Sequence, residues 1–161
     1  GAMQQLVQRT KSETSSGTQV KRRYCLYFHH SVNADEVVYC GIGTLDRPWQ
    51  VRNRQPEHTQ WLIKQYDQYG SLEPVVTVEV TNLSKEEALE SELEYIDRVR
   101  PIFNRNYSNP LVKLTEEGFF EAKRLRDLGY SYSKISQELK ISTMAAYRAL
   151  NKGVKAYDKY E

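Results

Sequence analysis

The sequence predicts an α+β protein in which a small three-stranded antiparallel sheet flanked by helices is followed by a small three-helix domain. Three observations predict this class. Two β-rich runs, YCLYFH over 24–29 and EVVYCG over 36–41, flank the polar turn HSVNAD, as in a β-hairpin. A third run over 73–81 alternates apolar and polar residues. From Leu111 onward the pattern changes to short helical segments.

The hairpin pattern also predicts which strand residues face each other. A turn centred on Asn33 would place Tyr27 opposite Tyr39, because cross-strand partners share a face of the sheet. The same register directs Cys25 and Cys40 to opposite faces, where they cannot form a disulfide. Without a Cys-x-x-Cys pair, these two cysteines indicate buried free thiols, and the three histidines also lack metal-site spacing.

Helix boundaries are marked along the rest of this region. After a loop over 44–57, the segment 58–70 has apolar residues at helical spacing and Gly70 as a stop. The third strand is followed by a helix that begins at Ser84, with Glu87 completing a capping box, and ends before Pro101. Its apolar stripe is expected to run through Ala88/Leu89, Leu93, Ile96 and Val99, and residues 102–110 are expected to be a linker.

Three helices are predicted in the C-terminal part. Thr115 caps the first and Gly129 ends it, Ser131 or Ser133 begins the second, and Ser142-Thr143 begins the third. The expected packing positions of this part are Leu128, Ile135, Leu139, Ile141, Ala146 or Tyr147, and Leu150.

Charge is distributed unevenly around the net value of +2. Residues 1–23 carry five basic and one acidic residue, residues 24–110 carry 8 and 13, and residues 111–161 carry 10 and 7. The basic flanks favour binding of a polyanion. The acidic middle is compatible with this only if cations bind there or if its carboxylates take part in a reaction. No apolar run approaches membrane-spanning length, so we expect no membrane partner and a cytoplasmic location.

The stretch VVYCGIGTLDRP carries the clearest functional signal. Two glycines, Gly41 and Gly43, frame Ile42 at the end of a strand that delivers Tyr39 and is followed by Arg47. Glycine permits close backbone approach. We therefore expect an open, shallow surface at Gly41 and Gly43 that a phosphodiester backbone could contact.

These motifs resemble the GIY-YIG nuclease family. CLYFHH followed by VYCGIG and Arg47 is similar to the subgroup with the motif Tyr-x-Gly-x-Gly-x-x-x-Arg, and ALESELEYIDRVRPIFN resembles the family's glutamate helix and asparagine. Glu92 and Asn104 are the matching positions. The chain departs from the family pattern at three supporting positions, Cys25, Leu26 and Cys40.

The resemblance implies a metal-dependent phosphodiesterase site. Glu92 would hold Mg²⁺ (or Mn²⁺), Arg47 would brace the phosphate, and Tyr27 beside Tyr39 would orient or deprotonate the attacking water. Asn104 would fix the geometry of the site. A base role for Tyr27 needs a nearby cation such as Arg47 or the ion, because free tyrosine has a pKa of about 10.

Two of these assignments have alternatives. His58 is the competing base and is easier to use at neutral pH, although it could also only cap the helix that follows. Arg52 and Arg54 could substitute for Arg47. Among Glu90, Glu92 and Glu94, Glu92 is favoured because it falls on the apolar, inward stripe of its helix, where a carboxylate needs a partner.

The C-terminal segment 115–152 resembles a resolvase-like helix-turn-helix module. The resemblance implies that its third helix enters the major groove. Ser142, Thr143 and Tyr147 are the candidate base or backbone contacts, and Lys140, Arg148 and Lys152 would meet phosphates. The alternative is a small protein-interaction or dimerisation domain.

The expected organisation therefore has three parts: a flexible basic arm over 1–23 (with a probable expression scar at 1–3), a GIY-YIG-like domain over 24–107 and a helix-turn-helix domain over 108–161. The expected function is site-specific cleavage of double-stranded DNA, of restriction or phage/homing type, in a bacterial or phage-infected cell. Cutting both strands suggests a homodimer on DNA. The alternatives are a non-catalytic DNA-binding regulator and a nuclease selective for branched or damaged DNA.

Overall fold

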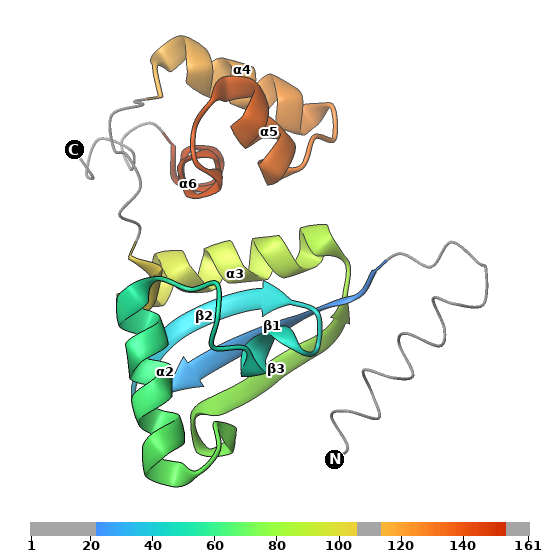
Figure 1. Cartoon of the computed structure of the whole chain (residues 1–161). Coiled ribbons are helices and arrows are strands. Elements are labelled where there is room, and N and C mark those ends of the chain that lie inside the picture. The colour runs from blue at the N-terminus through green and yellow to red at the C-terminus, as the bar shows by residue number, and fades with distance from the viewer. Residues whose placement is uncertain (1–21, 106–113, 154–161) are drawn as a thin grey trace, which may run out of the picture. The chain divides into compact units, whose positions relative to one another are not determined.

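The computed structural model describes residues 22–105 and 114–153 (Figure 1). The chain divides into two compact units, residues 1–105 and 106–161, whereas the sequence predicted a boundary between 107 and 108. The α+β class, with a three-stranded antiparallel sheet and a separate helical part, is confirmed. The predicted arm over 1–23 lies outside the described residues except for Arg22 and Arg23. Arg23 Nε donates to Asn82 Oδ1 at 2.8 Å.

The sheet of the first unit has the order β2-β1-β3. Its strands are β1 (Tyr24–His30), β2 (Val37–Gly43) and β3 (Val76–Leu83), and β1 pairs antiparallel with both neighbours. The third strand begins later than predicted, because Glu73–Val75 form the short 3-10 helix η2. Pro74 lacks the N–H that a sheet ladder requires, which accounts for the later start.

The predicted hairpin register was wrong by two residues. Tyr27 pairs with Gly41 and His29 pairs with Tyr39, and the register shifts between His29 and His30. This irregularity and the hydrogen bond from Ser31 N to Glu36 O at 2.8 Å move the centre of the turn beyond Asn33. A slip of two residues keeps every side chain on its predicted face. Cys25 and Cys40 therefore still face opposite sides, and both are buried free thiols.

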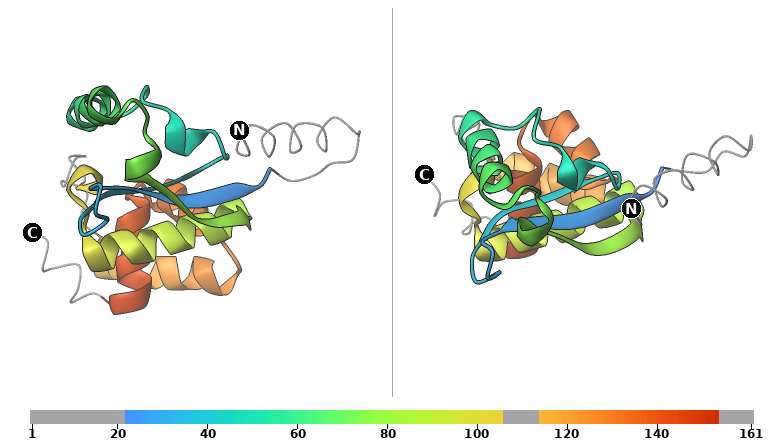
Figure 2. Two further views of the ribbon diagram at one scale, coloured as in Figure 1. Left: turned by 90° about the horizontal axis from the view of Figure 1, so that it is seen from below. Right: turned by 60° about the horizontal axis from the view of Figure 1, so that its bottom comes forward.

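Helices cover the two faces of the sheet (Figure 2, left). Helix α3 (Lys85–Val99) packs on one face, where the ring centroids of Phe28 and Tyr95 lie 4.6 Å apart. Helix α2 (Pro56–Tyr69) and the 3-10 helix η1 (Arg47–Trp49) cover the other face. Leu62 of α2 packs in an apolar cluster with Leu72, Val75 and Val76, and Trp49, Val51 and Trp61 pack against this cluster.

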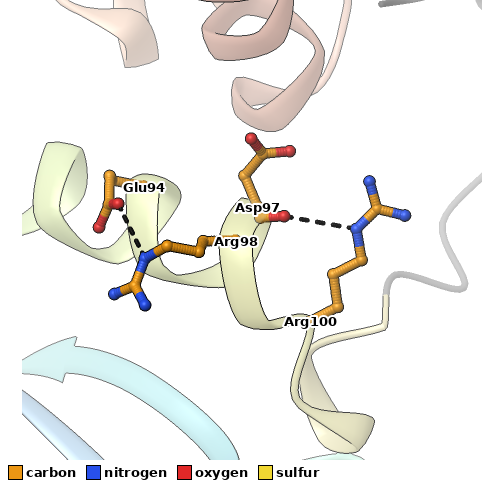
Figure 3. A network of polar contacts seen from close by, with 4 residues as sticks. All are labelled: Glu94, Asp97, Arg98 and Arg100. Carbon is orange, nitrogen blue, oxygen red and sulfur yellow. Dashed lines mark hydrogen bonds and ion pairs between the residues drawn. The ribbon is translucent and has the colours of Figure 1, made fainter.

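The ends of these helices follow local sequence signals. Gly70 ends α2 in the left-handed conformation, and Ser84 and Glu87 form the predicted capping box of α3. Helix α2 begins at Pro56, two residues earlier than predicted, because proline is favoured in the first turn. Beyond α3, Arg100 is left-handed and its Nε donates to the Asp97 carbonyl at 3.4 Å (Figure 3).

Three capped helices form the second unit: α4 (Glu116–Asp127), α5 (Tyr132–Leu139) and α6 (Thr143–Lys152). The side chains of Thr115, Ser131 and Ser142 cap them, as predicted. The buried apolar side chains of this unit are Ala122, Leu125, Tyr132, Ile135, Ile141, Ala146 and Ala149. Leu128, a predicted packing position, is 62% exposed because it follows the last helical residue of α4.

Within residues 22–105 and 114–153, no helix has both the length and the apolar character that a bilayer crossing requires.

Candidate active site

Gly41 lies at the centre of the candidate site. A Cβ atom at this position would lie 2.6 Å from Tyr27 Cζ and Oη and 2.6 Å from Tyr39 Cε2. Only glycine therefore lets the two phenol rings converge, with their centroids 6.1 Å apart. The predicted open surface at Gly41 is wrong, because the chain's own aromatic rings fill that space.

Gly43 serves a neighbouring side chain in the same way. A Cβ atom here would lie 2.7 Å from both Cβ and Cγ of Arg47. The stem of Arg47 thus crosses directly over the strand. Gly43 therefore has a packing role beside Arg47, and its contact with a phosphodiester stays a prediction.

Arg54 is the guanidinium that contacts a phenol. Its Nη1 donates to Tyr27 Oη at 3.1 Å, and its carbon Cζ lies 5.7 and 5.4 Å from the ring centroids of Tyr27 and Tyr39. Nε donates to the Gln50 carbonyl and Nη2 to the Arg47 carbonyl, both at 2.7 Å. Since a guanidinium has five N–H groups, these three bonds leave two for a ligand.

Arg47 contacts the loop that precedes Arg54 and does not bond the phenols. Its Nη1 and Nη2 donate to the carbonyls of Arg52 and Asn53 at 3.0 and 2.9 Å. Asn53 has a φ of 61°, so the chain turns sharply just before Arg54. Arg47 thus holds the loop that presents Arg54, while its positive charge still acts on both phenols.

His58 is buried beneath these rings and does not cap its helix. The N-cap position of α2 is Gln55, and the imidazole of His58 turns inward toward the sheet. Its Nε2 lies 2.9 Å from His29 Nδ1, and its ring centroid lies 4.4 Å from that of Tyr39. Phe103 stacks on the other side at 4.8 Å with an interplanar angle of 12°. Burial lowers the pKa of His58 to about 3, with the charges of Arg54 and Arg47 acting in the same direction.

The two phenols are held in the protonated form by the protein groups alone. Burial raises the pKa of Tyr27, and Arg54 opposes this only in part. Burial and the neighbouring Tyr27 likewise raise the pKa of Tyr39 above its usual value. The predicted effect of a cation on Tyr27 is thus present, but it comes first from Arg54 and is outweighed by burial.

Among the three candidate glutamates Glu90, Glu92 and Glu94 of α3, the structure separates Glu92 from the other two. Glu90 and Glu94 are exposed, and Glu94 forms an ion pair with Arg98 at 3.1 Å (Figure 3). Glu92 is half-buried near Ala88 and Leu93, which are both buried.

The negative charge of Glu92 raises the pKa of both Tyr27 and Tyr39, so it lies within electrostatic range of both rings. Burial raises the pKa of Glu92 itself to about 7. Val99, predicted on the same stripe, is 41% exposed at the last position of α3.

Asn104 joins the site to the edge of the sheet. Its Oδ1 accepts from Cys40 N at 2.7 Å and its Nδ2 donates to Cys40 O at 2.8 Å. It belongs to the 3-10 helix η3 (Ile102–Asn104), so the predicted linker over 102–110 begins later than expected. Asn104 thus positions the segment of β2 between Tyr39 and Gly41.

A metal ion would have to be held largely by Glu92. Among the residues that the structure describes, no group of three or more His, Cys, Asp or Glu side chains could bind an ion. Within the same residues, Glu92 has neither a hydrogen bond nor an ion pair. This donor set fits Mg²⁺, which keeps several waters and often takes one or two carboxylates together with substrate phosphates.

The predicted DNA contacts of the second unit lie at the end of α5, at the start of α6 and along α6 itself. Lys140 ends α5 with a φ of 57°, and Ser142 caps α6 by accepting from Ala145 N at 3.0 Å. Thr143 and Tyr147 lie one turn apart on α6, as do Arg148 and Lys152. The ring of Tyr147 also packs edge-on against Tyr132, with centroids 5.5 Å apart.

One residue of the site was missed in the sequence analysis, and another was not singled out there. His29 is fully buried between His58 and Pro48, and its position two residues after Tyr27 on a strand was the available signal. Arg54 was recognised only as a substitute for Arg47. Nothing in the local pattern separates it from Arg52.

No protein-family model matches this chain, and neither a curated protein nor a solved structure matches it.

Proposed function

We propose that the protein is a metal-dependent endodeoxyribonuclease that hydrolyses phosphodiester bonds in double-stranded DNA. The observation that carries this proposal is the convergence above Gly41 of two phenols, the Arg54 guanidinium and His58, within range of the charge of Glu92. Phosphodiester hydrolysis needs a cation for the phosphate and a group that accepts a proton from water. Both types of group are present in this cluster.

Arg54 is suited to bind the scissile phosphate. The three hydrogen bonds to Tyr27, Gln50 and Arg47 fix the guanidinium plane, and two N–H groups are left for phosphate oxygens. This fixed orientation lowers the entropy cost of binding. Arg47, which bonds the loop carbonyls before Arg54, supplies further positive charge near the site.

Glu92 would hold Mg²⁺ or Mn²⁺, which when bound would neutralise charge on the phosphate and on the leaving oxygen. The proton of the attacking water would pass to His58, or to Tyr27 where the bound ion and the arginines favour its phenolate. Burial lowers the pKa of His58, and the positive charges of Arg54 and Arg47 lower it further. A bound phosphate opposes that effect and therefore makes the imidazole a better base in the complex with DNA.

Plasmid cleavage tests the proposal directly. Supercoiled plasmid with Mg²⁺ should be converted to nicked or linear DNA, and chelation of the metal should stop the reaction. The Arg54→Ala variant should be inactive, whereas Arg124→Ala, which removes an exposed arginine paired with Glu121 on α4, should cleave normally. Intact plasmid with the wild-type protein under all metal conditions contradicts the proposal.

A second candidate is a DNA-binding regulator without catalysis. The observation that favours it is the three-helix unit, in which a tight turn at Lys140 leads directly into the capped start of α6. Such a protein would shift the mobility of the plasmid and leave it intact. Mapping the cut sites separates the remaining alternative, because discrete fragments indicate sequence recognition and cuts at branches or lesions indicate structure recognition.

Cleavage of both strands leads us to propose a homodimer on DNA. Analytical ultracentrifugation of the protein with its DNA substrate tests this. A dimer is expected, and a monomer that cuts both strands in separate visits contradicts it.

A further inference from the structure

A chain of two histidines runs from the backbone of η1 to the candidate site. His29 Nε2 lies 2.7 Å from the carbonyl oxygen of Pro48, and His29 Nδ1 lies 2.9 Å from His58 Nε2. Both imidazoles are buried: His29 is 0% and His58 is 2% exposed. Each ring nitrogen in this chain must be either a donor or an acceptor, and the backbone determines which.

The carbonyl oxygen of Pro48 can only accept a hydrogen bond. His29 must therefore carry its proton on Nε2. Burial, together with the charges of Arg54 and Arg47, lowers the pKa of His29 to about 3, so this imidazole is neutral at pH 7 and its Nδ1 carries a lone pair. That lone pair can only accept, so His58 must donate to it from Nε2–H. A neutral His58 then has its own lone pair on Nδ1.

Nδ1 of His58 has no hydrogen-bond partner among the residues that the structure describes, whereas its Nε2 faces His29. The protein therefore leaves the Nδ1 lone pair unused. The groups that face His58 are His29 of β1, Tyr39 of β2 and Phe103 of η3, with the charges of Arg54 and Arg47 nearby.

We propose that His29 is a positioning residue that fixes the tautomer of His58 and so makes Nδ1 of His58 the proton-accepting atom of the site. The proton lost by the attacking water then arrives on Nδ1, and the imidazolium keeps its Nε2–H bonded to His29. The catalytic part of this inference rests on the proposed nuclease function. The tautomer itself does not, because it follows from the hydrogen-bond chain alone.

Nuclear magnetic resonance of the full chain with ¹⁵N-labelled histidine tests the tautomer. At pH 7, long-range ¹H–¹⁵N spectra should show an unprotonated Nδ1 and a protonated Nε2 for both His58 and His29. The signals are assigned with single histidine variants. A proton on Nδ1 of His58 overturns the inference, whatever the protein does to DNA.

Two variants of His29 test the positioning role. His29→Leu removes the acceptor, so His58 should populate both tautomers and the cleavage rate should fall about 10- to 100-fold, as for other groups that orient a reacting residue. His29→Asn retains an acceptor oxygen for His58 and should restore the Nδ1 lone pair and most of the rate. If the His58 tautomer is unchanged in His29→Leu, the proposal is wrong.

His30→Leu is the matched control. His30 is buried as well, but it bonds Ser31 O at 2.7 Å and Thr77 Oγ1 at 2.8 Å, and it has no contact with His58. This variant should lower stability without changing the tautomer of His58. If the wild-type protein has the expected tautomer of His58 but does not cleave DNA, only the nuclease function is contradicted. If it cleaves DNA with the other tautomer of His58, only the role of His29 is contradicted.

Discussion

The two faces of strand β1 use adjacent residues for different purposes. Leu26 and Phe28 point toward α3, where Phe28 packs on Tyr95. Tyr27 and His29 point toward α2 and η1, where their polar atoms bond Arg54, His58 and the Pro48 carbonyl. Burying polar groups costs free energy that an apolar core does not. The apolar face of β1 toward α3 therefore serves packing, and its polar face toward α2 indicates function, although α3 itself also supplies the Glu92 carboxylate.

The largest expected effect is a loss of cleavage in Tyr27→Phe with little loss of stability. Tyr27→Phe keeps the ring over Gly41 but removes the hydroxyl that accepts from Arg54. Cleavage should fall about 10²- to 10⁴-fold if this hydroxyl takes part in proton transfer, while stability should change by only about 1–2 kcal/mol. Single-turnover cleavage and urea unfolding measure the two effects.

Leu26→Ala on the opposite face should give the reverse result. Leu26 is 6% exposed, and its truncation should cost about 2–5 kcal/mol of the free energy of unfolding. Cleavage by the folded fraction should be nearly unchanged. If both variants lower activity and stability together, the two faces are not functionally distinct.

Gly41→Ala tests the close approach on the polar face. The added methyl would lie 2.6 Å from ring atoms of Tyr27 and Tyr39, so the rings or the strand must move. We expect a loss of about 1–3 kcal/mol from overpacking and about 10²-fold in cleavage from misplacement of the rings. Gly118→Ala in the second unit is the control, because its Cβ would meet the flexible side-chain end of Leu114 in that same unit.

Replacement of Arg54 or Arg47 by lysine tests which of the two guanidinium groups on the polar face matters more for cleavage. Arg54→Lys cannot keep three directed hydrogen bonds and should lower cleavage about 10- to 100-fold. Arg47→Lys should cost less than about tenfold, because the guanidinium of Arg47 bonds loop carbonyls and contacts neither phenol. The opposite order of effects at equal stability would restore Arg47 as the guanidinium that contacts the phosphate.

The last expected effect concerns stability alone and is its dependence on pH. His29 and His58 have pKa values lowered from 6.5 to about 3 in the folded state. The unfolded chain therefore binds more protons between these values, and stability should be lost as the pH falls below about 6.5. The double variant His29→Leu, His58→Phe should flatten this dependence. Leu26→Ala should lower the free energy of unfolding equally at all pH values in urea titrations.

Local signals predicted most of the fold. The capping box at Ser84, the stop at Gly70 and the caps at Thr115, Ser131 and Ser142 are each formed within a few residues, so the sequence contains them. The hairpin register failed because the irregularity at His29/His30 depends on backbone geometry that composition does not encode.

The site was only partly predictable for a related reason. Period-two alternation placed Tyr27 and Tyr39 on one face, and helical spacing separated Glu92 from its neighbours. The choice between Arg47 and Arg54 depends on a loop that turns at Asn53 with a φ of 61°, and no periodic pattern describes such a loop. The tautomer of His58 depends on a carbonyl ten residues earlier, which only coordinates can place beside His29.

The paired hydrogen bonds between Asn104 and Cys40 have a consequence for solubility. Strand β2 is an outer strand of the sheet, and such strands offer unpaired backbone groups to other chains. The Asn104 amide satisfies both backbone groups of Cys40 and imitates the next strand of a ladder. The Asn104 side chain thus covers the outer edge of β2 at Cys40, where another strand could otherwise pair, and holds the backbone between Tyr39 and Gly41 in place.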